Sequence, residues 1–419
     1  MPDTNAERKS LSLGKLRTFS SLKNPVYRLL FVGMIGQMAS MNMQLMAASL
    51  LIYRITDSAT LLGLMALAFA GPMLLFSLFG GIIADRIQKK YVLLGGQLLS
   101  VVVSLIIALS LTLGYLSTEY GGSWWILVVA AVCQGTVIAL MMPSSQAILH
   151  EIVGGEQLLN AASLNAFAMN GFRILGPALA GFLIDAFNFS AVYYLMTGLY
   201  LMSAFFISRM PFTGKTSSAG ESVLSDIKKG LNYVRHEITI LTILLFSIIS
   251  VVLAMPYVHL MPVFIEDVLQ VGASEMGILM SASGVGAIIG SLILASLPNK
   301  KRGLLFVISS LCSGMALVGF AFSKSWYLSL LLLAFVGLGQ SGRLALGNTL
   351  LQYYSKAEYR GRVMSILMME IGLMSLGAFG AALLTETIGV QSSIGGFAFT
   401  LVLVAIFTLA FVPRLRKLN

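Results

Sequence analysis

The stretch GIIADRIQKKYVL, residues 81–93, joins two apolar runs through a short loop in which one acidic side chain is followed by three basic ones. The run before it, 60–84, and the run after it, 91–115, are each long enough to cross a hydrocarbon core about 30 Å thick as a helix. A helix satisfies its backbone hydrogen bonds internally, as lipid requires. We therefore expect two antiparallel membrane helices here.

The composition extends this prediction to the whole chain. Of 419 residues, 57% are hydrophobic and 11% are charged, whereas soluble globular domains have about 25% charged residues. Apolar runs of about 20 residues recur from end to end and predict an all-α membrane protein with twelve transmembrane helices. The expected spans are 28–52, 60–84, 91–115, 124–148, 163–186, 190–208, 239–264, 274–297, 303–322, 326–350, 363–385 and 394–412.

The basic residues are distributed unevenly along the chain, and this predicts its orientation. The net charge is +10, and with the N-terminus in the cytoplasm 23 of the 27 Lys and Arg residues lie on that side. This asymmetry explains the charge without nucleic acid as a partner. We expect a multi-pass protein of a bacterial inner membrane with both termini cytoplasmic. The first 27 residues show no cleavable signal peptide.

One long connection, 210–237, divides the chain. Within it, four apolar residues stand at helical spacing beside basic ones, which predicts an amphipathic helix on the inner membrane surface or, alternatively, a solvated linker helix. These four are Leu224, Ile227, Leu231 and Val234. The expected domains are a cytoplasmic segment 1–27, a six-helix bundle 28–209, the linker 210–237, a second six-helix bundle 238–413 and a cytoplasmic tail 414–419.

A weak internal repeat supports this division. Glu156 in GGEQLLNAAS and Glu358 in KAEYRGRVMS stand 202 residues apart, where the fifth and eleventh predicted helices begin. Parallel repeats of this kind form two pseudo-symmetric bundles with a substrate cavity between them near the bilayer midplane. Rocking of one bundle against the other then gives alternating access.

The opening motif resembles the loop 2-3 signature of the major facilitator superfamily. A glycine at Gly81 would let two helices approach closely, and Asp85 could meet the positive N-terminus of the eleventh helix or the guanidinium of Arg362. Such a pairing would close the cytoplasmic side, although the same charges also serve as plain positive-inside signals. The expected gating residues are Gly81, Asp85, Arg86, Lys89, Lys90, Arg360 and Arg362.

Three further stretches look like the branch of this superfamily that contains the enterobactin exporter and the macrolide efflux proteins. They are IYRITDSATLLGL from 52, MPVFIEDVLQVGASEMGILMSASGVGAIIGSL from 261 and EYRGRVMSIL from 358. The resemblance implies efflux, often driven by protons. Gly176, Pro177 and Gly181 also resemble the family's antiporter motif, in which small residues and a proline permit bending and tight packing between the halves. The alternative is ordinary helix packing.

Three charged residues fall deep inside predicted helices, and together they form the preferred site. Arg173, Arg343 and Glu370 are costly in lipid, so a functional role is expected. An arginine in a cavity can hold a carboxylate, phosphate or catecholate, and Glu370 could carry a proton. The structural alternative is an Arg343–Glu370 bridge between helices.

Amide and thioether side chains gather on the first helix. Flexible methionines with a few amides suit a cavity that accepts varied amphipathic ligands, although methionine stripes are more often plain packing. Gln134 ends a stretch that resembles a superfamily motif, but Ala131 stands where that motif usually has arginine. The candidate lining residues are Gln37, Met38, Met41, Asn42 and Gln134.

The sequence thus predicts a secondary transporter, not an enzyme, that exports small amphipathic molecules such as a drug, siderophore or metabolite. Protons are a possible coupling partner, the bilayer surrounds the chain, and a monomer is expected. No cofactor or metal is expected, because His150, His236 and His259 form no ligand set. Two alternatives stay open: a lipid or lysolipid flippase of the same fold, and a membrane sensor or scaffold that does not transport.

Overall fold

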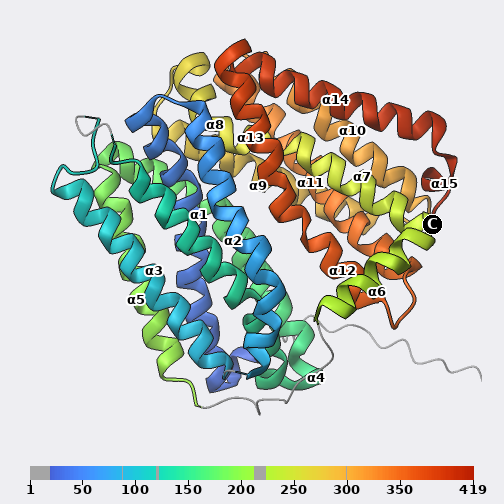
Figure 1. Cartoon of the computed structure of the whole chain (residues 1–419), viewed down its shortest axis with the longest axis horizontal. Coiled ribbons are helices and arrows are strands. Elements are labelled where there is room, and N and C mark those ends of the chain that lie inside the picture. The colour runs from blue at the N-terminus through green and yellow to red at the C-terminus, as the bar shows by residue number, and fades with distance from the viewer. Residues whose placement is uncertain (1–18, 87, 119–121, 212–222, 299) are drawn as a thin grey trace, which may run out of the picture.

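The computed structural model describes residues 19–86, 88–118, 122–211, 223–298 and 300–419, except for the side chains of 77–86, 156 and 223–229. The described residues form helices and no strands, and twelve of these helical stretches are long and apolar enough to cross a membrane. The predicted fold class is confirmed. Two bundles of helices stand side by side (Figure 1).

The first half of the chain forms five helical elements, of which the fourth holds two membrane crossings. They are α1 (Pro25–Thr56), α2 (Ala59–Arg86), α3 (Lys89–Thr112), α4 (Trp125–Ala186) and α5 (Phe189–Ser208). The Asn24 side chain caps α1 by accepting hydrogen bonds from the backbone N–H groups of Val26 and Tyr27. We call the end of the molecule that carries Asn24 and the linker helix the linker end, and the opposite end the far end.

Helix α4 differs from the sequence prediction, because the expected loop between 148 and 163 is helical. The chain crosses twice, at Trp125–Gly155 and Gln157–Ala186, and reverses at Gly154, which has φ 65°. A glycine adopts this left-handed conformation without strain. Both sides of the turn contact the start of α1: the Asn24 amide donates to the Ile152 carbonyl at 3.0 Å, and the Tyr27 hydroxyl donates to the Ala161 carbonyl at 3.0 Å.

The second half of the chain contains shorter pieces. They are α6 (Val223–His236), α7 (Ile238–Ala254), α8 (Pro256–Val263), the wide helical segment η3 (Phe264–Leu269), α9 (Ala273–Ser296), α10 (Arg302–Ala321), α11 (Trp326–Tyr354), α12 (Arg360–Met368), α13 (Glu370–Ile388), α14 (Val390–Phe411) and α15 (Pro413–Arg416).

Two predicted spans, 239–264 and 363–385, are therefore interrupted instead of continuous. The first breaks at Pro256, which has no N–H to donate along the helix. The second breaks at Met369, where the backbone bonds tighten and Gly372 donates to the Met369 carbonyl. Neighbouring breaks in membrane helices free backbone groups and change the direction of side chains near a binding cavity.

The linker contains the predicted helix, α6, which packs against the second bundle. Tyr233 stacks on Tyr359 with ring centroids 4.2 Å apart, and its hydroxyl accepts the Lys356 N–H at 3.1 Å. Val234 is buried whereas Leu231 is 52% exposed, so the predicted apolar face is only partly covered. The Leu224 and Ile227 side chains lie outside the described residues.

The two bundles meet along two helix pairs, α4 with α9 and α2 with α13. Small residues permit this contact: a Cβ on Gly181 would overlap the Ala273 carbonyl, and one on Gly277 would overlap the Pro177 carbonyl. In the second pair, a Cβ on Gly63 would come within 2.9 Å of the α13 backbone. Figure 1 shows the bundles meeting towards the far end and diverging towards α6 and α12.

Candidate functional site

Paired polar side chains join the two halves at the far end. Arg54, near the end of α1, forms an ion pair with Glu266 of η3, with Nε and Oε1 2.6 Å apart. Beside it, the Tyr53 hydroxyl donates to the Asp267 carboxylate, 3.0 Å from Oδ1. Both contacts link the first half of the chain to the second.

Two acids at the far end cap helices of the opposite half. Asp185, at the end of α4, accepts the backbone N–H groups of Ala273 at 3.2 Å and Ser274 at 2.7 Å, where α9 begins. Glu386, at the end of α13, accepts the Thr60 N–H at 3.1 Å, where α2 begins. A carboxylate is favoured at a helix N-terminus because the unpaired N–H groups carry partial positive charge. We call these two caps, with the Arg54 and Tyr53 contacts, the far-end latch.

The buried pair of Arg343 and Glu370 lies inside the second half. Arg343 is on α11 and Glu370 is the first residue of α13, directly after the break in that span. Arg343 Nη1 lies 3.4 Å from Glu370 Oε2 and donates to the Ser247 hydroxyl of α7 at 3.1 Å. The bridge that the sequence left as a structural alternative is therefore present.

This pair keeps unused hydrogen-bonding capacity. Among the described residues, Arg343 Nε and Glu370 Oε1 are buried and have no hydrogen-bond partner. Each residue is 5% exposed. An unpartnered donor and acceptor at such depth carry a desolvation cost, which a proton, an ion or a polar ligand group would reduce.

Arg173 lies apart from this pair, at the contact between the halves. It is half-buried on α4, and its carbonyl lies near Gly284 of α9. Among the described residues it forms no ion pair. The structure does not bring Arg173 into the Arg343–Glu370 pair.

Two pairs of polar side chains lie between the helices of the first half. Gln97 of α3 donates to Gln37 Oε1 at 2.9 Å, and the Ser100 hydroxyl donates to Gln134 Oε1 at 3.3 Å. In the described part of the chain, Gln97 Oε1 and Gln134 Nε2 have no partner. The sequence prediction missed Gln97. The signal was available, because Gln97, Ser100 and Ser104 recur at helical spacing in an otherwise apolar run.

The other lining candidates on α1 fall in different surroundings. Asn42 donates to the Met38 carbonyl of its own helix at 2.8 Å, and its Cβ packs against Gly176 of α4. Gly176 therefore serves packing within one half. Met38 is half-buried, and Met41 is 44% exposed.

The predicted gating residues are partly outside the described side chains, namely Gly81, Asp85 and Arg86. Lys89 forms an ion pair with Glu151 at 2.6 Å, and Lys90 donates to the Met210 carbonyl. Both of these contacts lie within the first half of the chain. Arg362 lies over the Tyr359 ring and Arg360 is exposed.

Comparison with protein families gives one family model, described as transmembrane secretion effector, which matches residues 16–419. The staphyloferrin A transporter of Staphylococcus aureus is 25% identical, over 80% of this chain and 83% of that protein. The enterobactin exporter EntS of Shigella boydii is 24% identical over 99% and 97%. Macrolide efflux protein A of Streptococcus pyogenes is 24% identical over 80% and 82%.

Solved structures show the same fold at lower identity. A bacterial homologue of the human lysosomal transporter Spinster, in an inward-facing and unoccupied conformation, superposes with a TM-score of 0.74 at 13% identity, covering 97% of this chain and all of that one. A D-xylose–proton symporter gives 0.71 at 14% identity, over 94% of this chain and 100% of that one.

Proposed function

Because the chain belongs to the transmembrane secretion effector family of major facilitator transporters, we propose that it exports small amphipathic molecules by alternating access. The relatives named above handle siderophores and a macrolide, which supports substrates of that size and polarity. The transporter assignment itself rests on the family match.

The observation that carries the proposal is the set of polar contacts that join the halves at the far end. Four contact points form the far-end latch, and nearer the middle of the bundle the Ser281 hydroxyl of α9 donates to the Ile174 carbonyl of α4. The helices diverge towards the linker end (Figure 1). This arrangement fits one of two access states, in which the latch must part before the opposite state forms.

The orientation follows from the basic residues. The linker end holds Lys89, Lys301, Arg360, Arg414 and their neighbours, so we assign it to the cytoplasm of a bacterial inner membrane. With this assignment, the present state accepts substrate from the cytoplasm, as an exporter requires.

We assign the coupling role to Glu370. Protonation of Glu370 would remove its negative charge and release Arg343. Because Glu370 is the first residue of α13, directly after a helix break, loss of this ion pair could change the direction of α13. Arg173, which lies between the halves without a described acidic partner, is assigned to the anionic part of a substrate. The amides Gln37 and Gln134, on the same half as Arg173, would supply hydrogen bonds to the substrate.

Flux into sealed vesicles tests this proposal. Purified protein is reconstituted, a pH gradient is imposed, and entry of a labelled macrolide or catecholate siderophore is measured. We expect gradient-driven flux that Glu370→Gln abolishes and that Glu275→Gln, an acid in the first turn of α9, leaves intact. Equal flux with and without the gradient would remove proton coupling. Movement of labelled lysolipid but of neither probe would favour the flippase alternative.

A further inference from the structure

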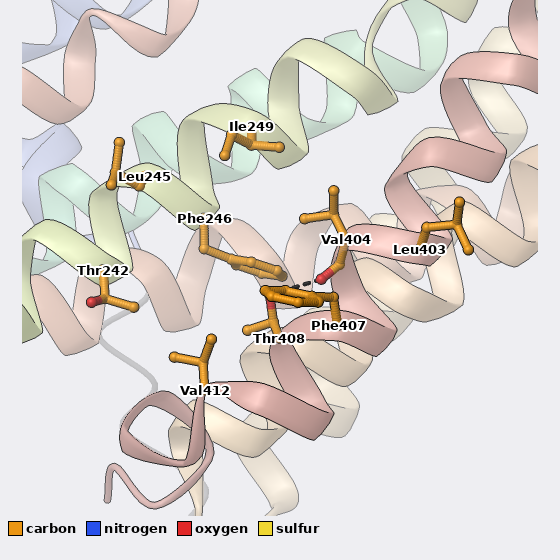
Figure 2. Close-up of a pocket in the computed structure, with 9 residues that line it drawn as sticks. All are labelled: Thr242, Leu245, Phe246, Ile249, Leu403, Val404, Phe407, Thr408 and Val412. Carbon is orange, nitrogen blue, oxygen red and sulfur yellow. Dashed lines mark hydrogen bonds between the residues drawn. The ribbon is translucent and has the colours of Figure 1, made fainter.

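A groove on the outer surface of the second half has a distinct shape and chemistry. It has a volume of about 520 Å³ and lies between α7 and α14 (Figure 2). Its lining residues are Thr242, Leu245, Phe246, Ile249, Leu403, Val404, Phe407, Thr408 and Val412. Both hydroxyls in this set bond within their own helices, Thr242 to the Ile238 carbonyl and Thr408 to the Val404 carbonyl, each at 2.7 Å. The surface that remains is apolar.

The groove has the length and position of one leaflet. From Leu403 to Val412 a helix rises about 14 Å, against a leaflet core of about 15 Å, half of the usual 30 Å. Val412 stands at the end of α14, at the linker end, and Leu403 stands about two and a half turns deeper. The groove therefore opens towards the headgroups of one leaflet and ends near the bilayer midplane.

Basic residues lie where the groove reaches that interface. The short helix α15, directly after Val412, carries Arg414 and Arg416, and Lys417 follows. This helix packs against both α7 and α14, the two walls of the groove. Arg416 Nη1 donates to the Leu409 carbonyl at 2.9 Å, beside the lining residue Thr408.

This basic segment is held in place on the bundle. Leu415 is 1% exposed, and the Leu418 carbonyl accepts the Gly303 N–H at 3.1 Å. The backbone N–H of Lys301 donates to Asn419 Oδ1 at 3.0 Å, which brings the basic start of α10 to the same place. A fixed cluster of cations loses less conformational freedom on binding an anion than a mobile tail would.

We propose that this groove binds one acyl chain of an anionic phospholipid from the leaflet at the linker end, with the headgroup phosphate against Arg414, Arg416 and Lys417. The apolar walls match the chain, and the guanidinium forks match the phosphate oxygens. The assignment to the inner leaflet rests on the orientation proposed above. Binding itself does not depend on transport.

Quenching of a tryptophan in the groove by brominated lipid tests the proposal. All three native tryptophans, Trp124, Trp125 and Trp326, stand at the far-end starts of helices, whereas Phe407 lines the groove at the opposite interface and is 58% exposed. The variant Phe407→Trp is reconstituted in phosphatidylcholine vesicles that contain rising fractions of dibrominated phosphatidylglycerol or dibrominated phosphatidylcholine. We expect half-maximal quenching at a lower fraction of brominated phosphatidylglycerol than of brominated phosphatidylcholine. Each cation that contacts the headgroup should lower that fraction about fivefold.

Two controls separate the groove from general attraction of anionic lipid. Adding Arg414→Gln and Lys417→Gln to the sensor should reduce the preference to at most the about fivefold that Arg416 alone can give, without changing quenching by phosphatidylcholine. Phe205→Trp, near the linker end of α5 and beside Arg209, samples the same depth on the other half and should show a smaller preference. Equal quenching by both lipids in the Phe407→Trp protein, or an equal preference at both positions, would overturn the proposal. Both lipids occupy both leaflets, so a wrong orientation or absent transport cannot produce either result.

Discussion

Removing the two acidic caps of the far-end latch should open the far end of the transporter. Asp185→Ala deletes the acceptor for the first N–H groups of α9, and Glu386→Ala deletes the acceptor at the start of α2. Both acids come from the opposite half, so the lost bonds belong to the state in which the far ends touch. The opposite state contains neither bond and should gain population.

The magnitude follows from capping energies. Loss of a cap costs about 1 kcal/mol, and both acids lie near water, where salt screens their charge, so we take no additional Coulomb contribution. Two independent caps give about 2 kcal/mol, which changes the ratio of closed to open far ends by about thirtyfold. Asp185→Asn keeps an acceptor oxygen that caps as well as aspartate does, so it should shift the ratio much less.

Distances between spin labels measure this ratio. Leu113 and Tyr327 are both 80% exposed on opposite halves of the far end and can carry labels after Cys133 and Cys312 are replaced. The double alanine variant should add a population at longer distance that the unaltered latch lacks. Lys324→Ala, which removes an exposed far-end charge, is the matched control. An unchanged distance distribution in the double variant, or an equal effect of Asp185→Asn and Asp185→Ala, would refute the reasoning.

Three further predictions concern packing and charge. Gly277→Leu should force α9 from the Pro177 carbonyl and lower the melting temperature in detergent, whereas Gly396→Leu, which meets nothing within 4 Å, should not. Arg343→Met alone should destabilise the protein by about 3–5 kcal/mol because it leaves a buried carboxylate unpaired, and adding Glu370→Gln should recover most of that loss in denaturant unfolding. Tyr233→Ala should release α6 from α12 and speed amide hydrogen exchange in α6, whereas Tyr233→Phe, which keeps the stacked ring, should not.

The twelve crossings could be predicted because they depend on length and apolar composition, which are local properties. The breaks could not. Pro256 is a visible signal in hindsight, but a proline in a membrane helix can also be accommodated without a break. Met369 gives no signal, because methionine is a good helix former and does not mark a break. The expected loop after 148 was too long, because a single glycine, Gly154 with φ 65°, is enough to reverse the chain between two helices.

The charged residues of the site could be predicted from the sequence, whereas most of the residues that they contact could not. A charge inside a membrane span must face a partner or a cavity, so Arg343 and Glu370 stood out, and their bridge was one of two alternatives. The far-end latch was missed. Its members, Asp185, Glu386 and Arg54, sit at helix ends, where charges are common, and only the packing of one half on the other brings each to its partner.

Locking the far-end latch tests the central claim most directly. Arg54 and Glu266 face each other across the halves, so Arg54→Cys with Glu266→Cys, in a chain without its native cysteines, places one thiol on each side of the latch, where a reducible bifunctional thiosulfonate reagent can join them. The account predicts that cross-linking stops vesicle flux of the transported probe, that reduction of the cross-link restores it, and that the locked protein still binds the probe from the linker end. Unchanged flux through the fully cross-linked protein would contradict alternating access by parting of these ends.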